Sequence, residues 1–183
     1  MSRGRIRAGA PNPGRRAERA VPAPAYNPPV ATWILTGSLE NLRVNVERGF
    51  DVIGLKEGRR RQAAELEPGD EIVFYVTGVQ AFGGIARVRS EMFEDRAPIW
   101  PQGTKRRPEP YPWRVEAEPV TVLDEDSFVP AEELAAELDH VRKWPSEHWH
   151  LAFQGQLRTV GEADAELLRE RIEASARAGA AHG

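Results

Sequence analysis

The chain has 183 residues, of which 40% are apolar and 29% charged, and its formal net charge is −3, a composition typical of one soluble globular domain. It contains no cysteine, which excludes disulfides, a thiol nucleophile and a cysteine-ligated zinc site. No apolar run approaches the roughly 20 residues of a membrane-spanning helix. The sequence therefore favours a cytoplasmic location away from membranes, and we expect a monomer.

Charge is unevenly distributed along the chain. Residues 1–29 contain six arginines and one glutamate, a net charge of +5, so the remaining residues must carry −8 to give the total of −3. This segment is rich in Pro, Gly and Ala, which predicts a disordered tail. It is interpreted as a solvated tail or misassigned start, as an arm that attracts nucleic acid, or as an organelle-targeting peptide. Disorder is also expected for residues 179–183, which leaves residues 30–178 as the folded domain.

The first half of the folded domain alternates between strands and helices. The run at residues 71–76 is apolar almost throughout, as in a central strand that is covered on both faces. Ser38 has the character of a helix N-cap, and Leu39, Leu42 and Val46 follow it on one helical face. In chain order we expect a strand over residues 31–36, a helix over 38–49, a strand over 50–55, a short helix over 58–66, a strand over 71–76 and its antiparallel partner over 81–89.

The second half contains one more strand and is otherwise helical. From residue 113 apolar and polar residues alternate, which predicts a half-buried strand with Trp113 and Val115 on its buried face and Arg114 on the other. Pro119 places this strand at a sheet edge or a bulge. Helices are expected over residues 130–134 and 162–177, with Trp144, Trp149, Leu151 and Phe153 in the core between them. Short strands with helices around them indicate the α+β class, with a mixed, strongly curved sheet or small barrel.

Motifs for catalysis are missing from the sequence. It has no G-x-S-x-G, Walker A or G-x-G-x-x-G pattern, and the glycines of residues 78–84 have the wrong spacing for a phosphate cradle. His148 and His150 form a lone H-x-H without the further ligands that a metal requires. The acids at residues 124–126 are typical of a solvated turn. We therefore expect no catalytic residue, no metal and no cofactor.

Aromatic and basic residues occur together at residues 99–107, IWPQGTKRR. Trp100 beside a basic loop suits base stacking combined with phosphate contacts, although packing against the prolines is an alternative interpretation. Arg59, Arg60 and Arg61 form either a solvated helix face or a phosphate contact. Because the folded part is negatively charged, nucleic-acid binding would need a shaped pocket or a local basic strip.

Six sequence blocks, in this order, resemble an EVE domain from about Thr32 to Ile172. EVE domains are PUA-like, as are the YTH readers of N6-methyladenine in RNA and the thymocyte nuclear protein group. The resemblance implies a PUA-like curved mixed sheet or pseudo-barrel flanked by helices, and recognition of a modified base in DNA or RNA rather than catalysis. The blocks are TWILTGSLEN (32–41), GFDVIGLKEGRRRQ (49–62), PGDEIVFYVTGVQAFGGIARV (68–88), PYPWRVEAEPV (110–120), FVPAEEL (128–134) and WPSEHWHLAFQG (144–155).

The same resemblance implies a binding site. A flipped base needs a flat apolar slot and a few donors and acceptors for its edge, and Trp100 and Ile53 would sandwich it. YTH readers have a tryptophan where this chain has Ile53, so modified cytosines fit as well as methylated adenine. The implied base pocket comprises Ser38, Asn41, Ile53, Gly54, Leu55, Thr77, Gly78 and Trp100. The implied phosphate contacts are Lys56, Arg59, Arg60, Lys105 and Arg106.

Two other classes of function are compatible with the residues. The chain could be an enzyme that acts on a modified nucleotide or small molecule, with Asp124, Asp126 or His148 as the catalytic group. It could also be an adaptor whose aromatic groove binds a peptide. Turnover would support the enzyme, and a pull-down with nuclease treatment would distinguish the adaptor from a nucleic-acid-binding protein.

Overall fold

The computed structural model describes residues 30–101 and 110–181. The predicted tail at residues 1–29 lies outside this range, as do Lys105 and Arg106 of the predicted phosphate contacts. Among the described residues, no helix has both the length and the apolar character needed to cross a membrane.

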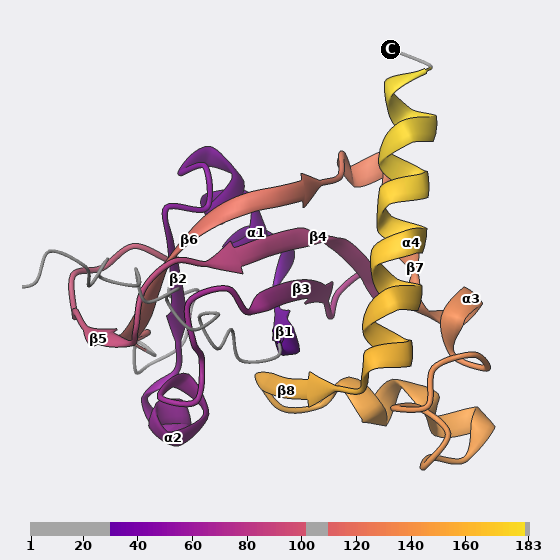
Figure 1. The fold of residues 1–183 in the computed structure, drawn as a ribbon, viewed down its shortest axis with the longest axis horizontal. Helices are drawn as coiled ribbons and strands as arrows, with labels where there is room; N and C mark the ends of the chain where they lie inside the picture. Colours follow the sequence, from indigo (N-terminus) through magenta and orange to yellow (C-terminus); the bar gives the residue numbers. More distant parts are fainter. Residues whose placement is uncertain (1–29, 102–109, 182–183) are drawn as a thin grey trace, which may run out of the picture.

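One curled, mixed sheet carries the fold (Figure 1). Its strands are β1 (Thr32–Gly37), β2 (Val52–Leu55), β3 (Glu71–Val76), β4 (Ala81–Val88), β5 (Phe93–Glu94), β6 (Trp113–Val122), β7 (Val129–Pro130) and β8 (Leu157–Val160). They lie in the order β2-β6-β4-β3-β1-β8, with β5 beside β6 and β7 beside β4. Of these described strands, β1 and β3 pair in parallel and the other pairs are antiparallel.

Helices flank the sheet. The α-helices are α1 (Leu39–Glu47), α2 (Arg60–Ala63), α3 (Ala131–Leu134) and α4 (Glu162–Ala180), and the 3₁₀ segments are η1 (Glu57–Arg59), η2 (Glu125–Ser127) and η3 (Ser146–Phe153). Figure 1 shows α4 standing across the ends of β6 and β4, and α2 at the opposite, lower corner. This arrangement confirms the predicted α+β class with a curved mixed sheet flanked by helices.

The central strand β3 is the one that the sequence predicted. It lies between β1 and β4, and all of its residues are buried. Successive side chains point to opposite faces of a strand, and those of β3 enter two different hydrophobic clusters. Phe74 and Val76 belong to the first, whereas Val73 and Tyr75 belong to the second. The continuous apolar run therefore reflects burial on both faces.

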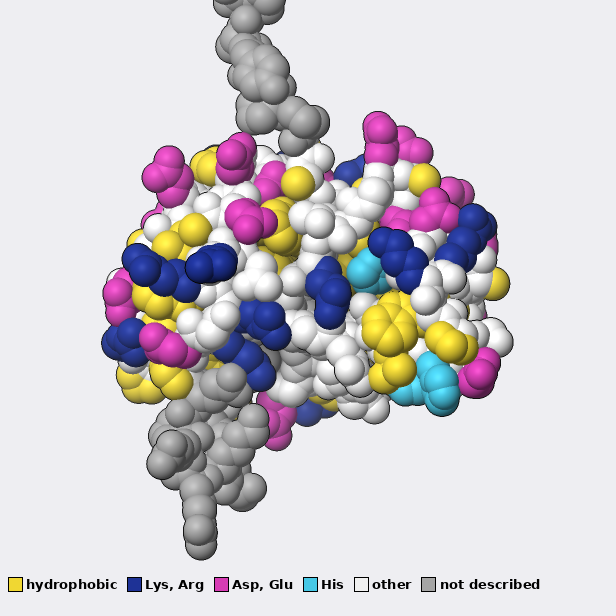
Figure 2. Space-filling model, turned by 90° about the horizontal axis from the view of Figure 1, so that it is seen from below, with side chains coloured by type: hydrophobic (Ala, Val, Ile, Leu, Met, Phe, Trp, Pro, Cys, Tyr) yellow, Lys and Arg dark blue, Asp and Glu magenta, His cyan; other side chains and the backbone are white. Residues whose placement is uncertain are grey.

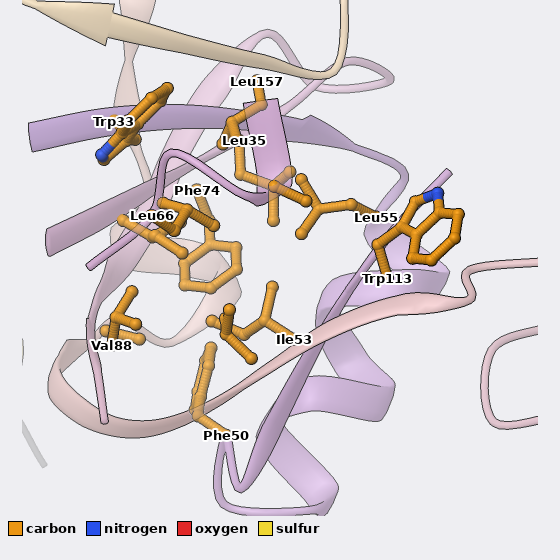
Figure 3. Packing of buried hydrophobic residues seen from close by; sticks show 14 of the residues in the cluster. Trp33, Leu35, Phe50, Ile53, Leu55, Leu66, Phe74, Val88, Trp113 and Leu157 are labelled. Carbon is orange, nitrogen blue, oxygen red and sulfur yellow. The ribbon is translucent and has the colours of Figure 1, made fainter. Parts of the chain in front are cut away.

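The first cluster fills the inside of the curl, and the second lies between the sheet and the helices α3 and α4. Figure 3 shows the first, in which Phe50 and Ile53, from the turn before β2 and from β2 itself, meet Phe74 of β3. The rings of Phe50 and Phe74 lie 5.1 Å apart, centroid to centroid. Full burial of such a side chain contributes about 1.5 to 3 kcal/mol to stability, so these contacts fix where β2 sits relative to β3.

The buried face of α1 is rotated from the predicted one. Leu42 is buried as expected, but Val46 is 45% exposed and the other buried residue of the helix is Asn45. Burying an amide costs free energy unless it is hydrogen-bonded, and Asn45 accepts a hydrogen bond from the indole of Trp100. The predicted stripe is wrong at Val46 because a paired polar residue takes the inward position.

Arg114 in β6 also lies on a covered side, contrary to the predicted alternation. Trp113 and Val115 are buried as expected, but Arg114 is only 2% exposed. The chain after β5 folds over this side of β6 and supplies acceptors to the guanidinium. This part of β6 is therefore covered on both faces.

Two element boundaries differ from the prediction, and one irregularity is confirmed. β2 begins at Val52 because Phe50 has a left-handed backbone (φ 58°) that a strand does not accommodate. α4 continues to Ala180, so the expectation of disorder from residue 179 is wrong for residues 179–180. Pro119 of β6 lies where its register with β4 shifts, which confirms the predicted bulge.

The predicted core residues between α3 and α4 are buried to different extents. Phe153 is 2% exposed, and Trp149 and Leu151 are half-buried. Trp144 is 38% exposed, so its placement in the core is corrected. The inward position in this part of the chain belongs to Val141, which is 3% exposed.

Asp70 ties the beginning of β1 to the turn that leads into β3. Its carboxylate accepts hydrogen bonds from the indole Nε1 of Trp33 (2.9 Å) and from the backbone N–H groups of Ala31 (3.0 Å) and Glu67 (3.1 Å). Asp70 is 5% exposed and Trp33 4%. Water therefore cannot readily replace these bonds, and the carboxylate holds the parallel pair in register.

Replacing Asp70 should destabilise the fold. We expect Asp70→Ala to lower the free energy of unfolding by about 3 kcal/mol, because the buried indole N–H of Trp33 and two part-buried backbone N–H groups lose their acceptor. Urea denaturation measures this change. Asp51→Ala is the control, since Asp51 forms an exposed pair with Arg48 and its loss should cost less than about 1 kcal/mol. Equal losses in the two variants would contradict the role assigned to Asp70.

Candidate functional site

A pocket opens at one edge of the sheet, where β1 and β3 end side by side. Because these two strands are parallel, both run toward this edge, and α1 begins there directly after β1. Edges of this kind are where ligands bind in sheets of parallel strands. The interior of the pocket has a volume of about 30 Å³, and the empty space is about 370 Å³ when the open mouth and the adjoining solvent are counted. Trp100, Tyr111 and Gln156 complete a lining that begins with β1, α1, β2 and β3.

The first turn of α1 forms part of the lining. Ser38 is the N-cap that the sequence predicted, and its Oγ accepts a hydrogen bond from the backbone N–H of Asn41 (3.2 Å). The Asn41 side chain donates from Nδ2 to the hydroxyl of Tyr111 (3.0 Å). The cap and this bond place two polar side chains of the helix at the pocket.

Two buried amides in the lining are oriented by the hydrogen bonds that their oxygens accept. Asn45 Oδ1 accepts from Trp100 Nε1 (2.7 Å), and Gln156 Oε1 accepts from the backbone N–H of Lys56 (2.7 Å). Because an indole N–H and a backbone N–H can only donate, each amide oxygen must face its donor. Asn45 is 5% exposed and Gln156 7%.

The NH₂ groups of these two amides have no acceptor among residues 30–101 and 110–181. A buried donor without a partner costs about 1 to 3 kcal/mol. Asn45 and Gln156 therefore supply the lining with two fixed donors that a ligand with suitable acceptors would satisfy.

Trp100 is held edge-on against the backbone of β2. A Cβ atom added at Gly54 would lie 2.3 Å from Cζ3 of the indole, so this glycine is what allows the ring to approach. The rings of Trp100 and Tyr111 meet at 5.4 Å and 61°, and Trp100 is 5% exposed. The guanidinium of Arg114 lies over the indole, 5.3 Å from the ring centroid. The ring is thus fixed from several sides.

Charged side chains are absent from the described part of the pocket lining. Tyr75 is part of the lining, but its ring stacks on Phe153 in the second cluster, where burial raises the pKa of its hydroxyl above the ordinary value of about 10. A charge placed in such a pocket would lose its hydration without gaining a partner. The lining therefore suits a neutral ligand.

Basic side chains lie outside the pocket, on the face that carries α2 and β8. Figure 2 shows Lys and Arg across this face, which is seen from below the view of Figure 1. Lys56 directly follows β2, and its backbone bond to Gln156 places it at the rim of the pocket. Arg59 ends η1, and the guanidinium of Arg60 lies 5.2 Å from the ring centroid of Trp113. Lys56, Arg59 and Arg60 are called the basic strip below.

Four of the predicted base-pocket residues come together in this lining, namely Ser38, Asn41, Gly54 and Trp100. Ile53 and Leu55 do not, because both are completely buried in the first hydrophobic cluster. Figure 3 shows Ile53 directed into that core. Successive residues of β2 face opposite ways, so Gly54 meets Trp100 while Ile53 cannot. The predicted sandwich of a base between Trp100 and Ile53 is therefore wrong on the side of Ile53.

Thr77 and Gly78 also lie outside the lining. Both are exposed in the turn that follows β3. Thr77 donates hydrogen bonds from its backbone N–H (3.0 Å) and from Oγ1 (3.3 Å) to the carbonyl of Gly37, which does line the pocket. Thr77 thus holds the end of β1, and the prediction that Thr77 and Gly78 belong to the base pocket is corrected.

Sequence reasoning missed Asn45, Tyr111 and Gln156. Asn45 lies four residues after Asn41, a spacing that places both on one helical face and could have indicated it. Tyr111 and Gln156 approach from distant parts of the chain, and no local pattern marks them. The groups suggested for an enzyme, Asp124, Asp126 and His148, are exposed and lie outside this pocket. Among the described residues, no three His, Asp or Glu side chains are grouped as metal ligands.

The curled mixed sheet flanked by helices is the PUA-like fold that the sequence blocks imply. The YTH domain of the Zygosaccharomyces rouxii MRB1 protein, solved in complex with N6-methyladenosine RNA, is similar with a TM-score of 0.57 and 15% identity, over 83% of this chain and 93% of that one. Human THYN1, solved in complex with 5-methylcytosine-containing DNA, is similar with a TM-score of 0.50 and 14% identity, over 77% and 97%. At these identities the likeness is one of fold.

Within this class the chain belongs to the EVE domain family, whose sequence profile matches residues 31–170. A UPF0310 protein of Saccharolobus solfataricus is 29% identical over 145 residues, which are 72% of this chain and 89% of that protein. The family and the fold expected from the six sequence blocks are both confirmed.

Enlarging Gly54 tests how Trp100 is held. We expect Gly54→Ala to push the indole away from β2, to break its bond to Asn45, and to lower the free energy of unfolding by about 1 to 3 kcal/mol. Tryptophan emission, read as the difference from Trp100→Phe, should shift to longer wavelength. Gly58→Ala is the control, because a Cβ there meets nothing within 4 Å. An unchanged emission spectrum in Gly54→Ala would argue against the tight contact.

Proposed function

We propose that this EVE domain binds a modified nucleobase of DNA or RNA in the pocket beside Trp100 and carries out no chemistry of its own. The observation that carries the proposal is a neutral, concave lining that holds two oriented amide donors next to an indole. The similar YTH and THYN1 structures are complexes with methylated RNA and DNA, which supports nucleic acid as the partner.

The edge of the base would be read by the amides. Asn45 Nδ2 and Gln156 Nε2 can only donate, so they select ring nitrogens and carbonyl oxygens of a base. Ser38 and Asn41 add polar groups from the start of α1. A ligand without acceptors at these places would leave buried donors unpaired, which is how polar sites reject wrong ligands.

The base would lie against the small part of Trp100 that lines the pocket, since Arg114 and Tyr111 pack on the rest of the ring. Base stacking on an aromatic side chain contributes about 1 to 3 kcal/mol. Apolar side chains of the lining, Leu35, Leu42 and Phe74, replace Ile53 as the surface that a modifying methyl group can contact. One additional carbon in an apolar pocket changes affinity by about 1 to 3 kcal/mol, roughly 10- to 200-fold. The modification would therefore be recognised by apolar contact.

The backbone of the nucleic acid would follow the basic strip. Lys56 follows β2 and bonds through its backbone to Gln156 of the lining, and Arg59 and Arg60 come next in η1 and α2. Lys and Arg side chains gather on the face that carries α2 (Figure 2). Phosphate contacts position a strand without reading its sequence. We keep Lys105 and Arg106 as proposed phosphate contacts, and they lie outside the described residues.

Oligonucleotide titration tests the proposal. We expect the wild type to bind single-stranded oligonucleotides that carry 5-methylcytosine or N6-methyladenine at least 10-fold more tightly than the unmodified sequence. Asn45→Leu and Trp100→Ala should each remove most of that preference, because one loses the donor and the other the stacking surface. Fluorescence anisotropy of labelled oligonucleotides gives the dissociation constants.

Trp144→Ala is the matched control for this titration, since Trp144 is exposed and outside the pocket. Its preference for modified bases should equal that of the wild type. Equal wild-type affinity for modified and unmodified oligonucleotides, across a panel of base modifications, would refute the proposal. Capture of a peptide that survives nuclease treatment would favour the adaptor instead.

Salt dependence separates the two parts of the site. Binding of a free modified nucleoside should hardly change between 50 and 200 mM salt, because the pocket is neutral, whereas oligonucleotide binding should weaken steeply. Replacing Arg59 and Arg60 by glutamine should reduce the slope of log affinity against log salt by about 0.7 to 0.9 per lost phosphate contact. Arg177→Gln, at the far end of α4, should leave the slope unchanged. An unaltered slope in the double variant would remove the basic strip from the interface.

A further inference from the structure

Arg114 is a charged side chain buried in the middle of the fold, next to the pocket but outside its lining. It is 2% exposed, and the alternating pattern of β6 predicts it on a solvent-facing side. A buried charge is retained only where hydrogen bonds and a counter-charge replace its hydration. Its partners therefore indicate what the residue is for.

The guanidinium joins both ends of the segment that carries the pocket wall. Nη1 donates to the carboxylate of Asp95 (2.5 Å), Nη2 to the carbonyl of Ala97, and Nε to the carbonyl of Tyr111 (3.1 Å). Ala97 precedes Trp100, and Tyr111 itself lines the pocket. Only the planar fork of an arginine reaches several acceptors in this way, since a lysine is a single point charge.

The same guanidinium also covers Trp100. It lies 5.3 Å from the centroid of the indole ring, close enough for a cation–π interaction. The indole N–H in turn donates to Asn45 Oδ1, and this bond determines which way the amide points. A chain of contacts thus runs from Arg114 through Trp100 to the Nδ2 donor of Asn45.

We propose that Arg114 is a positioning residue that sets the selectivity of the pocket by holding Trp100 in the orientation that presents the Asn45 donor to the ligand. This inference rests on the proposed function, because it concerns how that pocket recognises its base. Arg114 touches neither base nor phosphate, and it acts through the indole.

The matched control is Arg96, which anchors the same segment from outside. Arg96 donates to Glu57 (2.9 and 3.1 Å) and to Glu94 (2.7 Å). It is exposed, and none of its bonds reaches Trp100 among the described residues. A purely structural effect on the segment should appear in both arginine variants, whereas an effect on selectivity should appear only at Arg114.

The test compares Arg114→Lys with Arg96→Lys, well below the melting temperature of each variant. In Arg114→Lys, we expect affinity for the preferred modified oligonucleotide to fall at least 10-fold, affinity for the unmodified one to change less than threefold, and the salt slope to stay at the wild-type value. In Arg96→Lys the ratio of the two affinities should be unchanged. Asp95→Asn weakens the ion pair of Arg114 and leaves Arg114 itself in place. It should shift the ratio of the two affinities in the same direction as Arg114→Lys, by a smaller factor.

A ligand-free measurement keeps the inference separate from the proposed function. The indole N–H resonance of Trp100, assigned with Trp100→Phe, should move or broaden in Arg114→Lys and stay in place in Arg96→Lys. A resonance that stays in place in Arg114→Lys, or a wild-type affinity ratio in that variant, overturns the positioning role. A reduced salt slope would also overturn it, by showing direct phosphate contact. Loss of all preference in the wild type, with the resonance shifted as expected, would refute the proposed function alone.

Discussion

The parallel pairing of β1 with β3 is the constraint on which the rest of this structure depends. Two parallel neighbours end at the same edge of a sheet, so α1, which follows β1, must start at the point where β3 ends. That edge becomes a concave corner once β2 and the segment around Trp100 close over it. Asp70 secures the opposite end of the pair through three hydrogen bonds, of which the one from the Trp33 indole is buried. The position of the pocket is thus set by the direction of the strands, and individual side chains only complete its lining.

Paired polar groups then give this corner its chemistry. Asn45, Gln156 and Arg114 are all less than 10% exposed, and each carries a polar group that an apolar core would reject without a partner. Arg114 is satisfied within the fold, whereas among residues 30–101 and 110–181 the two amides have partners only at their oxygens. The remaining donors are therefore the places where the fold leaves hydrogen bonding to a ligand. Rigid support from Trp100 and Gly54 limits the freedom of the amide at Asn45 to turn inward and pair elsewhere.

Local patterns in the sequence correctly predicted the structural features that depend on neighbouring residues. The apolar run of β3, the Ser38 cap and the bulge at Pro119 follow from neighbouring residues, and the structure confirms them. Side chains whose environment comes from distant segments were misplaced: Ile53 was assigned to the pocket, and Arg114 to a solvent-facing side. Which faces of β2 and β6 are buried depends on the segments that fold over these strands. The alternation of apolar and polar residues along a strand carries no information about such distant segments. Four of the eight predicted pocket residues line it, because the family resemblance located the edge but not which face each residue takes.

The described lining of the pocket is uncharged, whereas the surface around it carries charged side chains. Residues 30–183 carry a formal charge of −8, so long-range attraction of a polyanion is weak and cannot produce tight, unspecific binding. A local basic strip still offers phosphate contacts at short range, where a strand is already close. In the proposed function, non-specific affinity would stay low, and a difference of about 1 to 3 kcal/mol at the pocket, about the value of one methyl contact, would decide which strands remain bound. A strongly basic surface would mask the same difference, so the acidity of the body is compatible with the proposed selectivity for the base.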